Sequence, residues 1–335
     1  MTDAGAAAYV LAGDIGGTKT ALALHAVSVG GATTLVREHT FASHDYRGLE
    51  QVIAAFLEPQ APRVAAAAFG IAGPVVDDAV STTNLPWRIE RRGVSAALGG
   101  VPVRLMNDLE STAYGALFLP PAALQTLNAG VTRRGHRAVI AAGTGLGQAF
   151  LYDDGRHYVP VATEGGHADF APRTPTEDAL LLFLRGRFDH VSYERVVSGP
   201  GLLNVFHFLD EELHRPVAPE VRARMTTEDP SAVIGSAAVA GACGTCRDAV
   251  ELFLSVYGAQ AGNLALTVMA TGGVYVGGGI VTKLLPLVAT SDFLRAFSAK
   301  GRYEGLMRQI PVWLIAEPKT GLIGAIHAAR ALVGG

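Results

Sequence analysis

The sequence predicts an α/β protein with two similar halves, and two observations support this fold class. Residues 9–24 run from an apolar strand through a glycine-rich turn into a second apolar run, YVLAGDIGGTKTALAL. Residues 138–152 repeat this plan about 130 residues later, as AVIAAGTGLGQAFLY. Each segment is typical of a hairpin that opens one half of the chain. Because strands and helices alternate after each hairpin, ligands are expected at the strand ends.

The other predicted elements follow from the same kind of pattern. Residues 64–71 and 101–106 are short apolar runs that indicate buried strands. The predicted helix 111–119 stops at two consecutive prolines, which predicts a domain boundary there. Later in the chain we expect helices at 177–188, 201–214 and 246–270, a short strand at 311–315 and a closing helix at 321–333.

Composition excludes several classes of protein. The chain has 335 residues, of which 49% are apolar and 17% charged, so it can bury a sizeable core and is not disordered. A net charge of −3 gives no general surface for binding nucleic acids. Two cysteines provide no disulfide framework and fit a reducing compartment. The first residues lack the basic start of a secretory signal.

Residues 252–282 carry no charge and are long enough by count to span a bilayer. This stretch nevertheless contains seven glycines in clusters, together with Gln260 and Asn263. We therefore expect a buried helix, a buried strand and a glycine loop rather than a membrane span.

Three glycine-rich turns, each closing an apolar strand, favour a nucleotide ligand. Residues 13–20, GDIGGTKT, lack one glycine of a P-loop but still offer backbone N–H groups and a hydroxyl to phosphate oxygens. Asp14 in this turn could hold Mg²⁺. Residues 143–147 and 276–280, GTGLG and VGGGI, are similarly bare turns. For residues 13–20, a plain tight hairpin remains the alternative.

Polar residues near strand ends are the candidates for chemistry. Asn107 and Asp108 follow an apolar strand, where they either cap the next helix or act on a ligand. Glu164 and His167 flank two glycines, and Glu194 precedes another glycine-rich turn. These groups suit a polyhydroxylated ligand better than a metal, because no further histidine or cysteine lies near them in the sequence.

The pair Cys243 and Cys246 forms a lone C-x-x-C motif. Zinc would need two more ligands, and a redox pair would want a thioredoxin-like setting. A structural role at the start of a helix is therefore the expected reading. The sequence contains neither a G-x-S-x-G elbow nor an H-E-x-x-H helix, which removes two common hydrolase classes.

Taken together, these segments resemble the bacterial glucokinase family. The matching stretches, in chain order from about residue 10 to residue 325, are GDIGGTKTALAL, FGIAGPV, TNLPW, MNDLESTAYG, AAGTGLG, TEGGHADFAP, YERVVSGPGL, GNLAL, GGVYVGGGI, KGR and IPVWLI. A related family of repressors and sugar kinases shares GDIGGTKT but carries a zinc-binding cysteine cluster after its E-x-G-H motif. No cysteine follows residue 167 until Cys243, so the non-zinc group is the better match. Lys19 departs from members that have asparagine there.

The resemblance implies a ribonuclease H-like fold of the actin/hexokinase type, with two domains and an active-site cleft between them. The small α/β domain would be 1–118, completed by a C-terminal helix at 319–335, and the large domain 119–318. Asp108 would be the catalytic base. The implied sugar ligands are Asn107, Glu164, His167, Glu194 and Gly145. The implied ATP-binding residues are Asp14, Gly16, Gly17, Thr18, Gly143, Thr144, Gly277, Gly278 and Gly279.

The implied reaction is ATP-dependent phosphorylation of D-glucose at its 6-hydroxyl, with Mg²⁺ near Asp14, giving glucose 6-phosphate for glycolysis. The resemblance also implies a cytoplasmic homodimer, and neither nucleic acid nor membrane is an expected partner. One alternative is a kinase for fructose, mannose or an amino sugar. A second is a sugar-sensing regulator without turnover, which the presence of Asp108 disfavours. A P-loop NTPase is the third.

Overall fold

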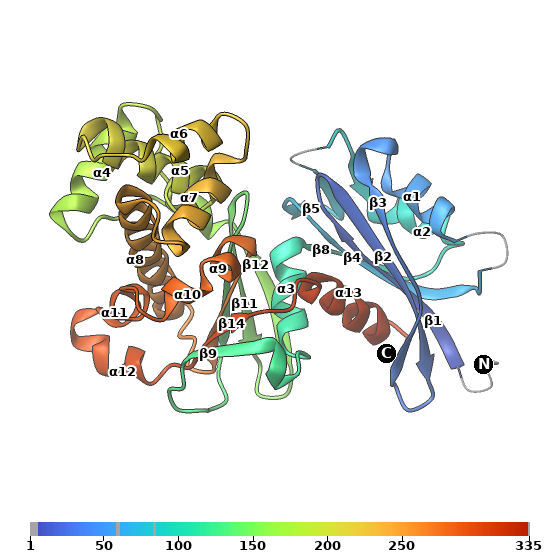
Figure 1. Cartoon of the computed structure of the whole chain (residues 1–335). Coiled ribbons are helices and arrows are strands. Elements are labelled where there is room, and N and C mark those ends of the chain that lie inside the picture. Colours follow the sequence, from blue (N-terminus) through green and yellow to red (C-terminus); the bar gives the residue numbers. More distant parts are fainter. Residues whose placement is uncertain (1–5, 58–60, 83–84, 334–335) are drawn as a thin grey trace. The chain divides into compact units, whose positions relative to one another are not determined.

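A computed structural model describes residues 6–57, 61–82 and 85–333 (Figure 1). The chain forms two compact units: residues 1–120, 158–162 and 317–335 make the first, and residues 121–157 and 163–316 the second. Two residues of the TNLPW stretch, 83 and 84, and the last two residues of the predicted helix 319–335 lie outside the described residues.

The first unit is built on a five-stranded sheet of order β3-β2-β1-β4-β8. Strands β1, β2 and β3 are antiparallel neighbours, whereas β4 runs parallel to β1 and β8 parallel to β4. The five strands are β1 (Ala6–Ile15), β2 (Lys19–Ser28), β3 (Thr33–Ala42), β4 (Val64–Ile71) and β8 (Val103–Asn107). A small antiparallel sheet holds β5 (Val75–Val76), β6 (Ala79–Ser81) and β7 (Arg88–Glu90). The helices are α1 (Leu49–Phe56), α2 (Arg91–Ala97), α3 (Asp108–Ala116) and α13 (Thr320–Ala331).

Apolar side chains alternate along β1, so both faces of the sheet are covered. Leu11 and Ile15 belong to a core with α1 and α2, whereas Val10 and Ala12 belong to a second core with α13. Figure 1 shows α1 and α2 together on one side of this sheet and α13 on the other. The C-terminal helix α13 is therefore part of the first unit.

Helices α3 and α13 cross at backbone contact, which explains two glycines. A Cβ atom on Gly115 would lie 2.0 Å from the carbonyl oxygen of Thr320, and one on Gly324 would lie 1.8 Å from that of Ser111. Any side chain would push the helices apart. The Ser111 hydroxyl also donates to the carbonyl oxygen of Gly321 (2.8 Å), which fixes the helices against sliding.

A second large sheet has six strands in the order β12-β11-β10-β13-β14-β9, and all of them except the edge strand β12, of which residues 158–162 are grouped with the first unit, belong to the second unit. Strands β10, β13 and β14 are parallel, whereas β11 and β9 are antiparallel to their neighbours β10 and β14. The six strands are β9 (Leu124–Asn128), β10 (Arg137–Ala142), β11 (Leu146–Asp153), β12 (Tyr158–Thr163), β13 (Gly273–Gly277) and β14 (Val312–Ile315). The helices are α4 (Pro175–Arg185), α5 (Gly199–His207), α6 (Pro219–Met225), α7 (Pro230–Val239), α8 (Gly244–Thr267), α9 (Gly279–Lys283), α10 (Leu285–Val288), α11 (Phe293–Ser298) and α12 (Glu304–Arg308).

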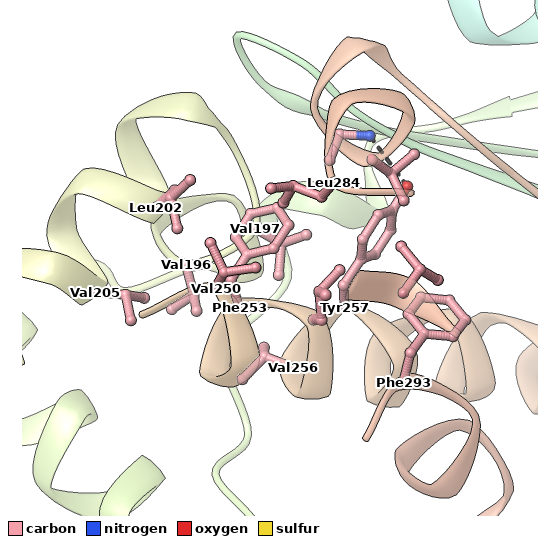
Figure 2. Close-up of a cluster of buried hydrophobic side chains, with 14 of the residues drawn as sticks. Val196, Val197, Leu202, Val205, Val250, Phe253, Val256, Tyr257, Leu284 and Phe293 are labelled. Atoms are coloured by element: carbon pink, nitrogen blue, oxygen red, sulfur yellow. Dashed lines mark hydrogen bonds between the residues drawn. The ribbon is translucent and has the colours of Figure 1, made fainter. Parts of the chain in front are cut away.

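The long helix α8 is the centre of the second unit's core. Figure 2 shows Val250, Phe253 and Tyr257 of this helix gathered with apolar side chains from other elements. The Tyr257 ring packs edge-to-face against Phe253 (6.0 Å between centroids) and Phe293 (5.6 Å). Aromatic pairs of this geometry add to the stabilisation that burial provides. Most of α8 is buried, which explains its lack of charged residues after Glu251.

The structure confirms both predicted hairpins and the predicted strands 64–71, 101–106 and 311–315, within two residues at each end. It also confirms that residues 252–282 form a buried helix, a strand and a glycine loop. Among the described residues, no helix combines the length and the hydrophobicity needed to cross a membrane.

Two predicted helices have different limits. The helix predicted at 111–119 is α3, which begins at Asp108 because Asn107 caps it. The helix predicted at 201–214 is α5, which changes into a π-helical turn over residues 208–212. The sequence analysis did not predict several elements, among them β3, β9, β12, α1, α2, α6 and α7.

Candidate active site

The turn between β1 and β2 carries the predicted phosphate-binding residues Gly16, Gly17 and Thr18. The N–H of Gly16 donates to the carbonyl oxygen of Lys19 (2.9 Å) and closes the turn. Ser43 holds it from outside: its hydroxyl donates to the carbonyl oxygen of Gly16 (2.9 Å), and its N–H donates to that of Thr18 (3.0 Å). The Ser43 hydroxyl also pairs with the buried Thr20 hydroxyl (3.0 Å). Because strand β2 follows directly, this turn is a hairpin and not a P-loop.

Asp14 lies on β1 directly before this turn and is largely shielded from solvent. Burial, followed by the negative charge of Asp108, raises the pKa of Asp14 from its ordinary value of 3.8 to about 6. Two carboxylates that repel each other make a favourable place for a cation, since positive charge between them offsets the repulsion. The residues present therefore fit a divalent cation at Asp14.

Asp108 is the first residue of α3, where the positive end of the helix dipole favours a negative charge. Its Oδ1 accepts a hydrogen bond from the N–H of Leu109 (2.8 Å). The preceding Asn107 caps the helix: its Oδ1 accepts from the same N–H (2.9 Å), and its Nδ2 donates to the carbonyl oxygen of Gly73 (3.1 Å). Through this cap, Asn107 orients the neighbouring Asp108. The assignment of Asn107 as a sugar ligand stays a prediction.

In the second unit, the structure brings Glu164, His167 and Glu194 together, although the sequence separates the first from the last by 30 positions. His167 Nδ1 lies 3.9 Å from Glu194 Oε1, and His167 Nε2 lies 4.0 Å from Glu164 Oε2. These separations exceed a hydrogen bond, so the three side chains can turn donors and acceptors toward a ligand. Glu164 and His167 are more than half exposed. Such a cluster could accept hydrogen bonds from, and donate them to, a ligand with several hydroxyl groups, and its assignment as a sugar site stays a prediction.

Two glycines let the backbone approach this cluster closely. A Cβ atom on Gly145 would lie 2.5 Å from Glu194 Oε2, which also accepts the N–H of Leu146 (2.9 Å). A Cβ atom on Gly166, between Glu164 and His167, would lie 1.9 Å from the carbonyl oxygen of Leu146. The glycine loop after β10 is therefore locked to the segments that carry the three polar residues.

A part-buried network of hydrogen bonds supports the segments that carry this cluster. The Lys300 ammonium donates to Asn263 Oδ1 (2.6 Å) and to the carbonyl oxygen of Ala259 (2.9 Å). Asn263 Nδ2 in turn donates to the Tyr193 hydroxyl (3.0 Å), and Tyr193 directly precedes Glu194. The N–H of Tyr193 donates to the carbonyl oxygen of Ala168 (3.0 Å), which follows His167. Burial, followed by the charge of a nearby arginine, lowers the pKa of Lys300 to about 8.

A cavity of about 820 Å³ lies within the second unit, beside the predicted nucleotide loops. Its volume is in the range of small-molecule sites. Gly143, Thr144 and Gly279 line one part of the wall. The rest comes mainly from α7 and the start of α5, and the sequence analysis did not predict this part. Small residues such as Gly235 and Ala232 keep the cavity open, and its lining is mostly apolar.

The other two glycines of the third loop act through the backbone. Gly278 has a φ of +96°, and a Cβ atom there would lie 2.0 Å from the carbonyl oxygen of Ala142. The Tyr257 hydroxyl lies between this loop and the loop that begins at Gly143. It donates toward the carbonyl oxygens of Ile140 and Gly277 (both 3.0 Å) and accepts the N–H of Ala142 (3.2 Å). One hydroxyl therefore ties the ends of β10 and β13 together, directly before Gly143 and Gly278.

Comparison with known proteins gives a consistent result over nearly the whole chain. Residues 11–332 match the family model described as glucokinase. The glucokinase of Trichormus variabilis is 41% identical, and the match covers 96% of this chain and 99% of the relative. The crystal structure of a glucokinase from an Antarctic psychrotroph has a TM-score of 0.84 and 29% identity, covering 96% and 99% of the two chains. A Streptomyces griseus ROK family glucokinase, solved with glucose and AMPPNP, has a TM-score of 0.63 and 23% identity, covering 96% and 99%.

The fold and the loops define a sugar kinase of the two-domain actin/hexokinase type. Within that class, the coverage and identity of the matches place the protein more narrowly. The chain belongs to the glucokinase family.

Proposed function

We propose that this chain transfers the γ-phosphoryl group of ATP to the 6-hydroxyl of D-glucose. The observation that carries the substrate class is the cluster of Glu164, His167 and Glu194, because it gathers acceptors and a donor from two separate segments. The psychrotroph relative is named a glucokinase, and the Streptomyces relative was solved with glucose. Carboxylates accept hydrogen bonds from sugar hydroxyls, and an epimer that leaves one buried group unpaired loses about 1–3 kcal/mol.

The base in this proposal is Asp108. As the sugar hydroxyl attacks the γ-phosphorus in line, this carboxylate accepts the hydroxyl proton. The two hydrogen bonds of Asn107 hold the start of α3 and so keep the carboxylate in place. Little covalent work falls to the protein, so orientation and charge account for most of the rate.

Each unit carries a glycine-rich loop to which the proposal assigns phosphate binding. Gly16, Gly17 and Thr18 in the first unit, and Gly143 and Thr144 in the second, offer backbone N–H groups to phosphate oxygens. The apolar cavity beside Gly279 fits the nucleoside. When bound with the nucleotide, Mg²⁺ supplies positive charge that offsets the charge of the phosphates, and Asp14 is the residue that would hold it, directly or through water. A cytoplasmic homodimer is part of the same proposal.

The test is release of ADP from Mg-ATP with and without glucose, with mannose, fructose and N-acetylglucosamine in parallel. Release that depends strongly on glucose supports the proposal. Release with another hexose only would replace the substrate and keep the reaction. If folded protein binds glucose in calorimetry but releases no ADP with any sugar, the proposal fails and a sugar-sensing regulator becomes the better account.

A further inference from the structure

The two cysteines of the chain meet at the start of α8, outside the residues assigned to the reaction. Cys243 is the N-cap of this 24-residue helix, and Cys246 lies in its first turn. Both thiols are free and buried. The Sγ atom of Cys243 accepts the N–H of Cys246 at 3.3 Å, so the two cysteines are in contact at the first turn of the helix. The C-x-x-C motif alone predicts only a structural role for them.

The surroundings make the two thiols chemically different. Burial raises the pKa of Cys243, but hydrogen bonds from the Cys246 thiol and from the backbone N–H groups of Cys246, Ala218 and Thr245 outweigh it, and the net pKa lies below the ordinary value. Burial and the neighbouring Cys243 raise the pKa of Cys246. The positive end of a helix dipole favours a thiolate at Cys243. Cys243 is thus the better nucleophile of the two, and Cys246 is the neighbour that holds its proton more firmly.

A purely structural role does not explain the pair. Capping the helix would require one acceptor only, and serine, threonine, aspartate and asparagine serve that purpose better than cysteine. Cys246 contributes only its backbone N–H to the cap, and its side chain is fully buried. A metal site would need further ligands, and no cluster of three or more histidine, cysteine, aspartate or glutamate side chains suitable for a metal occurs in the described part of the chain.

We propose that Cys243 and Cys246 form a redox-active dithiol that a peroxide converts into an intramolecular disulfide. The Cys243 thiolate attacks one oxygen of hydrogen peroxide. The O–O bond breaks, a sulfenic acid forms on Cys243, and the departing hydroxide takes up a proton to give water. The Cys246 sulfur, losing its proton, then attacks the Cys243 sulfur. The S–S bond forms, and the S–O bond breaks to release a second water. Two thiols are oxidised and one peroxide is reduced.

The geometry suits both steps. Cys243 is 5% exposed, and its neighbours in the chain, Ala242 and Gly244, are exposed, so the pair lies at the edge of the core and the oxidant it suits is a small one such as a peroxide. Cys246 follows Cys243 by three residues and its N–H is bonded to the Cys243 sulfur, so the side chains start close together, and the two sulfurs need to approach to about 2.05 Å. The pair also lies close in the chain to the cavity of the second unit, because Ala240 lines that cavity and only two residues separate Ala240 from Cys243. The dithiol itself does not depend on the proposed kinase activity.

Intact-protein mass spectrometry after peroxide treatment tests the proposal without measuring turnover. Because the chain has two cysteines only, any intramolecular disulfide joins Cys243 to Cys246. The wild type should lose two hydrogen atoms and both titratable thiols, and a thiol reductant should restore them. Cys246→Ser should instead gain one oxygen, as a sulfenic acid that dimedone traps. Cys243→Ser keeps a good helix cap and should react about tenfold more slowly than Cys246→Ser.

Three results would overturn the proposal. One is wild-type protein that keeps both thiols at a peroxide concentration that fully oxidises free glutathione. Another is wild-type protein that gains oxygen atoms without ever losing hydrogen. The third is equal oxidation rates in the two serine variants. Circular dichroism of each variant shows whether the fold is retained, and a failure of the proposed kinase reaction leaves all of these readouts intact.

Discussion

Tyr257→Phe removes one hydroxyl and tests whether the ends of β10 and β13 are tied together for nucleotide binding. The hydroxyl is fully buried and makes contacts with Ile140, Ala142 and Gly277. In the variant the ring stays, so the packing against Phe253 and Phe293 is retained. The N–H of Ala142 loses its acceptor in a place that water does not reach. Leaving a buried donor unpaired costs about 1–3 kcal/mol.

We therefore expect the free energy of unfolding to fall by about 1–3 kcal/mol, measured by urea denaturation. The loops beginning at Gly143 and Gly278 lose their common anchor at the same time. If about 1 kcal/mol of this loss must be regained when ATP binding orders the loops again, the Kd for ATP rises about fivefold. Calorimetric titration with a non-hydrolysable ATP analogue measures this directly.

Tyr275→Phe is a matched control from β13, the strand whose end the Tyr257 hydroxyl ties to β10. The Tyr275 hydroxyl accepts a hydrogen bond from Nη1 of Arg137 (2.6 Å), which lies at the start of β10, the end opposite to Gly143. We expect this variant to lose stability without weakening nucleotide binding. If Tyr257→Phe binds the analogue as tightly as the wild type, or if both variants weaken binding equally, the hydroxyl of Tyr257 does not position the loops.

Three further substitutions test the site. Asp108→Ala should lose nearly all turnover while glucose still binds in calorimetry, and activity within about tenfold of the wild type would exclude this residue as the base. Lys300→Met removes the hydrogen bond to Asn263, which supports the cluster of Glu164, His167 and Glu194. The KM for glucose should therefore rise about tenfold while the KM for ATP stays unchanged. Equal rises in both KM values would indicate general damage to the fold. Asp14 has a raised pKa in the folded protein, so its ionisation lowers stability as the pH rises from about 4 to 6. Asp14→Asn should therefore be about 1–3 kcal/mol more stable at pH 7 and inactive, with the two melting curves converging below pH 4; a constant difference at all pH values would contradict this.

The sequence predicted the elements whose signals are local. Both hairpins follow from glycine-rich turns between apolar runs, and strand β4 was predicted with its observed limits because residues 64–71 are uniformly apolar. Helix α7 escaped prediction because PSAVIGSAAV consists of small residues without an apolar stripe. Its small side chains line the cavity on one side, while Val233, Ile234, Ala237 and Ala238 pack into the core on the other. Strand β3 is an edge strand with mostly exposed residues, so it also lacks a periodic apolar pattern.

The candidate site was predictable where residues are recognised by motif, and less so where contacts are long-range. Glu164, His167 and Glu194 were predicted and lie together. The support of this cluster by Lys300 was not predicted, because its partner Asn263 lies 37 positions away. Asn107 was expected to bind the sugar, yet the contacts in the structure are those of a helix cap, an alternative that the sequence had left open. No local pattern distinguishes the two uses of an asparagine at a strand end.

The crossing of α3 and α13 has a consequence for synthesis on the ribosome. The face of the first sheet that holds Val10 and Ala12 is covered by residues 320–331, which are made last. Translation at ordinary rates needs roughly 10 to 40 s to proceed from residue 107 to residue 320. During that time the nascent first unit exposes an apolar sheet face, while most of the second unit is already available to fold. Nascent chains stalled before residue 320 should therefore bind hydrophobic-surface chaperones through their N-terminal third, and release should follow once α13 emerges.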